Sequence, residues 1–350
     1  MNIGNTRARI IRSIGLVLLA GTAALSLHGA LPRSEAVASG KAAPQERETA
    51  APLAAEAGQR AEAKRRKSVY TLILAGMDEV SGNTDTILIG RVDAAERRID
   101  LVSIPRDTYV NRDWEVRKIN CVYTAAKNAG EDGLEALRTA MRDLCGFDAD
   151  CCVVLDLNTV EEAIDLMGGV YFDVPFDMDY EDAAQDLSIH IPKGYQCLNG
   201  EQCVQICRYR KNYVNGDLDR ISLQHDFLGA AARQFISLGA IPNLARVVQM
   251  TASSADSDLS PANIAFFLRC AIQCRAEDIH FGTMPNRPAD AGGLSYTFAE
   301  KDEWLALLND ALDPFNVPIT EENLNLVYIE NGLFRSTSGT ICGESYLYRK

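Results

Sequence analysis

The sequence predicts an α/β protein whose main domain has three layers, α-β-α, with helices on both faces of a central mixed sheet. Short and nearly continuous apolar segments, such as 70–75 and 152–157, are typical of strands that are buried on both faces. They are mixed with longer segments of helical periodicity, such as 132–144, which indicates a sheet covered by helices. The chain has 350 residues, 47% of them hydrophobic, so it can bury a sizeable core.

The individual elements follow from these patterns in chain order. Strands are expected at 70–75, 86–92, 98–104, 152–157, 170–174 and 324–329. Helices are expected at 132–144, 159–167, 201–207, 221–238, 243–251, 262–274 and 302–311. Pro105 and Pro175 end two of the strands, because proline has no amide hydrogen to give to the ladder. Gly168-Gly169 ends the helix at 159–167, since glycine readily adopts the left-handed conformation of helix ends.

The N-terminal residues predict a membrane anchor. Arg7, Arg9 and Arg12 precede the uncharged segment 13–32. A basic leader followed by an apolar stretch is typical of either a secretory signal or a signal anchor. A segment of roughly 20 helical residues is long enough to cross a bilayer. We interpret 13–32 as an uncleaved transmembrane helix, although Ala36-Val37-Ala38 resembles a cleavage site.

This interpretation divides the chain into four parts. Residues 1–12 form a cytoplasmic basic leader, because positive charges stay on the cytoplasmic side. The Ala-rich residues 33–67 form a tether, and residues 68–350 form an extracytoplasmic domain. We therefore expect a single-pass protein of the cell membrane.

Composition argues against a nucleic-acid partner and does not indicate a catalytic or metal-binding role for the cysteines. The net charge of −13 argues against nucleic acid, whose phosphate backbone requires a basic surface. The chain holds 10 cysteines and 4 histidines, without the paired spacing of zinc sites. We expect buried cysteines with one or two disulfides, which an extracytoplasmic location permits.

Asp78 and Asp85 form the first candidate site. Asp78 follows the first predicted strand and Asp85 precedes the second, so neighbouring strands would bring both carboxylates to one end of the sheet. Such oxygen ligands suit Mg²⁺ (or Mn²⁺), whose coordination is completed by water and phosphate oxygens. The alternative is a pair of turn or capping aspartates.

Arg106 and Asp107 form the second candidate site. Pro105 ends the strand at 98–104 and places both residues at its C-terminal edge, where open α/β sheets bind ligands. The alternative is a salt bridge on the surface.

Further basic residues suit an anion. Arg208 and Arg210 are two apart and point to one side of an extended chain, and guanidinium groups match phosphate oxygens. Arg220 and Gln224 share one face at the start of the helix at 221–238, where the helix dipole favours anions. The alternative is an ordinary charged surface. Together, metal ligands and arginines are typical of phosphoryl transfer.

The order of these motifs resembles that of the LytR-CpsA-Psr family of cell-wall glycopolymer ligases. The resemblance covers residues 68–238. The matching segments are Gly76-Met77-Asp78, Thr84-Asp85-Thr86-Ile87, Ser103-Ile104-Pro105-Arg106-Asp107, Lys118-Ile119-Asn120, Gly168-Gly169-Val170, Asn199-Gly200-Glu201-Gln202, Cys207-Arg208-Tyr209-Arg210, Gly216-Asp217, Arg220 and Gln224.

The resemblance implies a membrane-bound phosphotransferase. It would move a glycopolymer from a polyprenyl-pyrophosphate carrier onto peptidoglycan and leave a phosphodiester link. The implied site consists of Asp78 and Asp85 as metal ligands, Arg106, Arg208, Arg210, Arg220 and Gln224 as pyrophosphate ligands, and Arg106 and Asp107 as catalytic residues. The resemblance also implies an apolar tunnel for the prenyl chain, and residues 221–250 would either line it or pack in the core.

The chain departs from the family pattern at two places. Asn83 stands where the family usually has an arginine, and residues 125–128 replace its usual glycines, which predicts a different loop there. Two other functions stay open at this point. One is a pyrophosphatase acting on the same lipid-linked substrate, and the other is a non-catalytic envelope regulator that binds lipid phosphates.

Overall fold

The computed structural model describes the body of the chain. The described residues are 63–77, 82–166, 168–182, 187–209, 223, 226–227, 230–231, 234, 249–250, 252–343 and 347. The predicted leader, the anchor at 13–32 and the tether up to residue 62 lie outside them. In the part of the chain so described, no helix has both the length and the apolar character that a membrane crossing requires.

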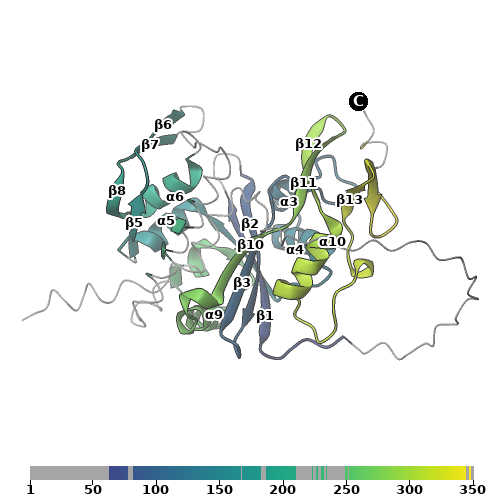
Figure 1. Ribbon diagram of the computed structural model, residues 1–350, viewed down its shortest axis with the longest axis horizontal. Coiled ribbons are helices and arrows are strands. Elements are labelled where there is room, and N and C mark those ends of the chain that lie inside the picture. Colours follow the sequence, from purple (N-terminus) through teal and green to yellow (C-terminus); the bar gives the residue numbers. More distant parts are fainter. Residues whose placement is uncertain are drawn as a thin grey trace, which may run out of the picture.

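A mixed sheet forms the centre of the described molecule (Figure 1). Its strands, in spatial order, are β10 (Ile279–Thr283), β3 (Arg98–Ser103), β2 (Thr84–Asp93), β1 (Val69–Met77), β4 (Cys151–Asp156) and β9 (Asp256–Ser257). Strand β2 is antiparallel to β1 and β3, whereas β4 runs parallel to β1 and β10 parallel to β3. The C-terminal ends of β1, β3, β4 and β10 therefore meet the start of β2 at one edge, which we call the carboxyl edge.

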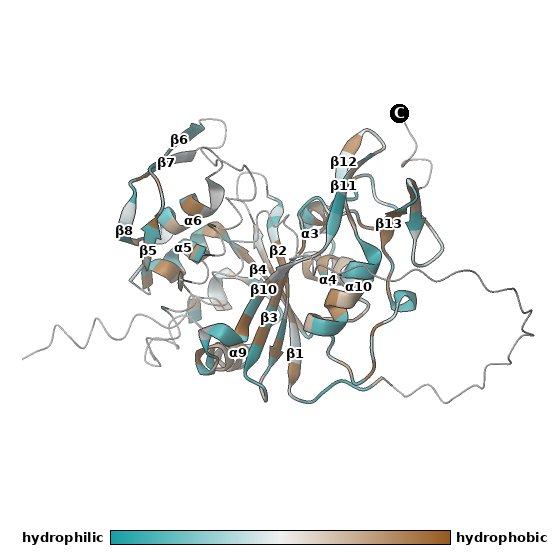
Figure 2. Cartoon of the chain, viewed as in Figure 1, coloured by the Kyte–Doolittle hydropathy of each residue, from teal (hydrophilic) through white to brown (hydrophobic). Residues whose placement is uncertain are grey.

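Helices cover both faces of this sheet, because its strands are apolar on both sides (Figure 2). Leu72 and Leu74 pack toward one layer, and Ile73 and Ala75 pack toward the other, as alternation along a strand requires. One layer contains α5 (Leu157–Leu166), α6 (Gly200–Arg208) and α9 (Pro261–Gln273). The other contains α3 (Ile119–Asn128), α4 (Gly133–Cys145) and α10 (Lys301–Leu307), which continues as the π-helical η2 (Leu308–Leu312). The predicted mixed α/β architecture is confirmed.

Helix α6 is positioned by local signals. Asn199 and Gln202 form a capping box at its start, in which each side chain binds the main-chain amide of the other. Gly200 lies so close to α5 that an added Cβ would collide with the Glu161 carbonyl oxygen. This close approach requires glycine and brings the start of α6 against α5. The helix ends at Arg208.

Four two-stranded antiparallel sheets and two short 3₁₀ helices complete the described structure. The pairs are β5 (Val170–Val174) with β8 (Gly194–Leu198), β6 (Met178–Asp182) with β7 (Leu187–Ile191), β11 (Asn286–Ala291) with β12 (Leu294–Ala299), and β13 (Val327–Glu330) with β14 (Leu333–Ser336). The 3₁₀ helices are η1 (Ala276–Asp278) and η3 (Glu321–Asn323). A small separate core joins the last two hairpins, and it includes Tyr109, Tyr296 and Leu347.

Two sequence expectations about local structure need correction here. The strand expected at 324–329 begins only at Val327, because the amides of Asn325 and Leu326 bind Asp143 and Thr337 instead of a neighbouring strand. Residues 125–128 form the end of helix α3 rather than a loop.

The nine cysteines whose side chains are described are free thiols, so the expected disulfides do not occur among them. Cys151 and Cys152 are adjacent in β4 and point into opposite layers, which prevents them from pairing. Burial raises the pKa of both thiols to about 12, because the thiolate loses its hydration. These residues therefore act as small apolar core residues.

Candidate functional site

Asp85 and Arg106 meet at the carboxyl edge of the sheet. Asp85 is the second residue of β2, and its Oδ2 lies 3.3 Å from Nη1 of Arg106. Its other oxygen, Oδ1, accepts from the amide of Asn120 at 3.4 Å. The side chain of Asp85 is 20% exposed and that of Arg106 is 39% exposed, so the pair is open to a ligand.

A tight turn after β3 presents Arg106 and Asp107. Pro105 follows Ile104, and its carbonyl oxygen accepts from the amide of Thr108 at 2.9 Å and from the Thr108 hydroxyl at 2.6 Å. The two residues between them therefore project from the carboxyl edge. This confirms where the sequence placed Arg106 and Asp107.

Lys118 completes the charge pattern, although sequence reasoning did not assign it to the site. Its Nζ lies 2.7 Å from Oδ1 of Asp107, whereas Nε of Arg106 lies 3.7 Å from the other oxygen. Two main-chain hydrogen bonds bring Lys118 back beside Asp107. The amide of Val110 donates to the Arg117 carbonyl, and the amide of Ile119 donates to the Thr108 carbonyl. The sequence signal that could have assigned Lys118 to the site is its place in Lys118-Ile119-Asn120, one of the segments that resemble the family pattern.

Asn120 connects the three parts of the site. Its main-chain amide donates to the Arg106 carbonyl at 3.2 Å, and its main-chain carbonyl accepts from the Thr84 hydroxyl at 3.1 Å. Its side chain reaches Asp85. Since Asn120 is buried, these contacts fix the start of α3 against the ends of β2 and β3.

Cys121 lies beside the site and does not supply a nucleophile. Its thiol donates to Oδ1 of Asn120 at 3.3 Å. Burial raises the pKa of this thiol, and the nearby carboxylates of Asp107 and Asp85 raise it further, while Lys118 lowers it. The thiol therefore stays protonated at neutral pH, and the thiolate is the form that attacks.

The remaining predicted metal and pyrophosphate ligands lie outside the residues that the structure describes. Asp78, Arg210, Arg220 and Gln224 are not among the described residues, and the side chain of Arg208 is also outside them. The backbone nevertheless places the end of β1 beside Asp85, because Met77 pairs with Thr84. Of the predicted side chains, the described structure brings together Asp85, Arg106 and Asp107.

The donor set fits a magnesium-like ion. The two contacts of Asp85, at 3.3 and 3.4 Å, are longer than strong charge-assisted hydrogen bonds, so its oxygens remain able to bind a cation. Among the described residues, no three side chains of the His, Cys, Asp or Glu type gather around one point. A hard cation held by one or two carboxylates, with water and phosphate oxygens as its other ligands, matches this arrangement.

The expected apolar tunnel is described only in small part. Leu223 and Phe227 are buried in the core, where the ring of Phe227 meets that of Phe172 at 5.2 Å. A pocket of about 620 Å³ lies near Met250 and is lined by Glu162, Asp165, Leu166, Gln249, Met250, Ser253 and Ser254. Most of residues 221–250, which were expected to line the tunnel, lie outside the described ones, so the tunnel stays a prediction.

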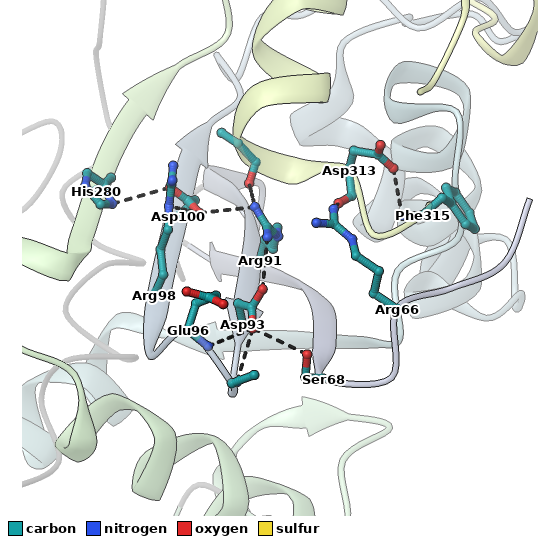
Figure 3. Close-up of polar contacts among 12 residues, drawn as sticks. Arg66, Ser68, Arg91, Asp93, Glu96, Arg98, Asp100, His280, Asp313 and Phe315 are labelled. Atoms are coloured by element: carbon teal, nitrogen blue, oxygen red, sulfur yellow. Dashed lines mark hydrogen bonds and ion pairs between the residues drawn. The ribbon is translucent and has the colours of Figure 1, made fainter. Parts of the chain in front are cut away.

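A second charged cluster lies at the opposite edge of the sheet (Figure 3). Arg91 is buried and binds Asp93 at 3.1 Å, with Asp100 at 3.8 Å. Asp100 also accepts from Arg98 at 2.7 Å and lies 3.4 Å from His280. The arginines and aspartates of this cluster pair with one another, so we interpret it as structural rather than as a ligand site.

The fold and the site define a class of protein: an α/β protein that presents carboxylates and cations together at the carboxyl edge of its sheet. Residues 34–312 match the sequence model described as the LytR_cpsA_psr family. The chain belongs to the LytR-CpsA-Psr family.

Comparisons with individual proteins agree with this assignment. The chain is 24% identical to "Polyisoprenyl-teichoic acid--peptidoglycan teichoic acid transferase TagV" of Bacillus subtilis, over 55% of this chain and 51% of that protein. It is 32% identical to "Cell wall biosynthesis protein LcpA" of Corynebacterium glutamicum, over 50% of this chain and 37% of that protein. The match thus spans about half of TagV and less of LcpA. Protein gbs0355 of Streptococcus agalactiae shares the fold, with a TM-score of 0.57 at 18% identity over 69% of this chain and 86% of that one.

Proposed function

We propose that this protein transfers a glycopolymer from a polyprenyl-pyrophosphate carrier onto peptidoglycan. The observation that carries the proposal is the Arg106 guanidinium, which lies between the carboxylates of Asp85 and Asp107 at an open sheet edge. Membership of the LytR-CpsA-Psr family and the likeness to a teichoic acid transferase support it.

In the proposed reaction, a sugar hydroxyl of peptidoglycan attacks the polymer-proximal phosphorus. The new P–O bond replaces the bond to the bridging oxygen, and polyprenyl phosphate leaves with that oxygen. Asp107 orients the hydroxyl or accepts its proton, and Lys118 holds this carboxylate in place. Arg106 neutralises the negative charge that develops on the leaving phosphate, together with the predicted ligands Arg208, Arg210, Arg220 and Gln224.

Asp85, with Asp78, would hold Mg²⁺ (or Mn²⁺). When bound, the ion supplies positive charge to the pyrophosphate oxygens. The proposal includes the location as well: residues 13–32 anchor the protein in the cell membrane, and the catalytic domain faces the extracytoplasmic side, where peptidoglycan lies. The basic residues that precede this uncharged segment support that orientation.

The test compares Arg106→Ala with Arg142→Ala. Arg142 is a matched control, because it is 45% exposed and lies 3.1 Å from Asp148, away from the site. Purified protein is given a lipid-pyrophosphate-linked glycopolymer and peptidoglycan, and covalently attached polymer is measured. We expect transfer by the wild type and Arg142→Ala and almost none by Arg106→Ala. Release of free polymer without attachment would replace the proposal with a pyrophosphatase, and binding without turnover would replace it with a regulator.

A further inference from the structure

The β11–β12 hairpin contacts the turn that carries the site. The amide of Thr297 donates to the Asp107 carbonyl at 2.9 Å, and the amide of Tyr109 donates to the Thr297 carbonyl at 2.9 Å. Thr108 and Thr297 accordingly form a parallel bridge. The main chain of Asp107 is thus fastened to β12, an element far along the chain.

The residue before Thr297 contacts the cation that binds Asp107. Nζ of Lys118 lies over the ring of Tyr296, 5.7 Å from its centroid. This distance is within the range of a cation–π interaction. The same ammonium lies 2.7 Å from the Asp107 carboxylate, so it has an anion on one side and an aromatic face on another.

The ring of Tyr296 is itself immobilised. It is 1% exposed and meets the edge of Tyr109 at 5.2 Å, with Phe298 at 6.3 Å. Val327 and Leu347, from the C-terminal part of the chain, belong to the same small core. A close-packed ring of this kind offers a fixed surface, whereas a lysine chain alone has many rotamers.

We propose that Tyr296 is a positioning residue that holds the Lys118 ammonium against Asp107. Its face limits the directions in which the ammonium can turn, so that the Asp107 carboxylate stays oriented at the carboxyl edge. The consequence for turnover rests on the function proposed above, whereas the placement of Lys118 does not.

The first test measures placement without activity. An amine-acylating reagent labels exposed lysines, and mass spectrometry gives the rate at each site. Lys118 is 23% exposed, and the exposed Lys193 serves as the reference. We expect Tyr296→Leu to raise the Lys118 rate several-fold, and Tyr296→Phe, which keeps the ring, to leave it unchanged. An unchanged rate in Tyr296→Leu overturns the proposal. If that variant does not fold, Tyr296→Met, which keeps much of the bulk, replaces it.

The second test is a double-mutant cycle on transfer. Tyr296→Leu should lower turnover about tenfold, in line with the strength of a partly desolvated cation–π contact. In a Lys118→Met background the same change should have no further effect, because the group through which Tyr296 acts is gone. Full and independent effects of the two changes would mean that Tyr296 serves only the core, and the proposal would be wrong. Absence of transfer by the wild type would instead remove the proposed function, and labelling would still decide the placement.

Discussion

Arg106 lies 3.3 Å from Asp85, although the two residues are 21 positions apart and belong to different strand ends. Both side chains are partly exposed, so their ion pair contributes little to the stability of the fold. A guanidinium and a carboxylate that remain accessible at a sheet edge are available to a ligand.

Replacing Asp85 should affect the metal requirement more than stability. Asp85→Asn removes a charged oxygen ligand but keeps the shape, so we expect transfer to fall roughly 100-fold at limiting Mg²⁺. The free energy of unfolding should change by no more than about 1 kcal/mol, because the pair is partly exposed and solvent screens it. Transfer is measured across a Mg²⁺ titration, with a chelator as the zero point. Equal Mg²⁺ dependence in the wild type and the variant would remove Asp85 from the metal site.

Replacing Lys118 should lower transfer, whereas a lysine at the other end of the same helix should be dispensable. In Lys118→Met, Asp107 keeps Arg106, at 3.7 Å, as its cationic neighbour and loses the closer ammonium that holds it in place. We expect turnover to fall roughly 10-fold to 100-fold. Lys127→Met is the control, because Lys127 binds Tyr123 and Asp256 away from the site. Turnover of both variants is measured beside their thermal unfolding. Similar losses in the two variants would contradict a specific role for Lys118.

The Cys121 thiol should react slowly with iodoacetamide at pH 8. Burial raises the pKa of this thiol from its ordinary value of 9.0, so the reactive thiolate is scarce at that pH and increases only as the pH rises further. Lys118→Met should slow the reaction, because Lys118 lowers this pKa. Alkylation is followed by mass spectrometry from pH 7 to 10, with the exposed Cys197 as reference. Fast alkylation of Cys121 at pH 7 would contradict the prediction.

The β6–β7 hairpin should be more stable in mild acid. His190 lies 2.6 Å from Glu181 and 2.7 Å from Asp179, and its hydrogen bonds to Glu181 and then Asp179 raise the imidazole pKa above 6.5. A raised pKa in the folded state means that the stabilisation is complete below about 6.5 and is lost as the pH rises through the raised value. Hydrogen exchange of residues 187–191, corrected for intrinsic rates, measures this change.

A matched variant isolates the contribution of the imidazole. His190→Gln keeps a polar side chain but does not titrate, so the pH dependence of exchange in this hairpin should disappear. Strand β1, which belongs to the six-stranded sheet and not to the separate β6–β7 pair, supplies the unchanged reference. A hairpin whose corrected exchange is the same at pH 5.5 and 8.5 in the wild type would disprove the role of His190.

The central strands are predictable because their signal is local. The segments at 70–75, 86–92 and 98–104 fall on β1, β2 and β3, since buried strands are apolar runs bounded by turn residues. Helix α3 is not predictable in this way: its first turn has no acidic residue, and its N-cap, Lys118, makes no capping hydrogen bond. The strand expected at 170–174 coincides with β5, whereas β6, β7, β8, β11, β12 and β14 are missed, because alternation over four to six residues is too short a pattern.

By itself, the sequence determined that the segments of β1 to β4 are strands and that Asp85, Arg106 and Asp107 stand at strand ends, whereas β9 and β10 of the same sheet were not expected. Apolar runs and a strand-ending proline act within a few residues, so they are legible without a structure. Only the tertiary structure decided that Lys118, Asn120 and Tyr296 join that edge. Their contacts depend on how a loop, a helix start and a distant hairpin pack together, and such packing has no local pattern in the chain.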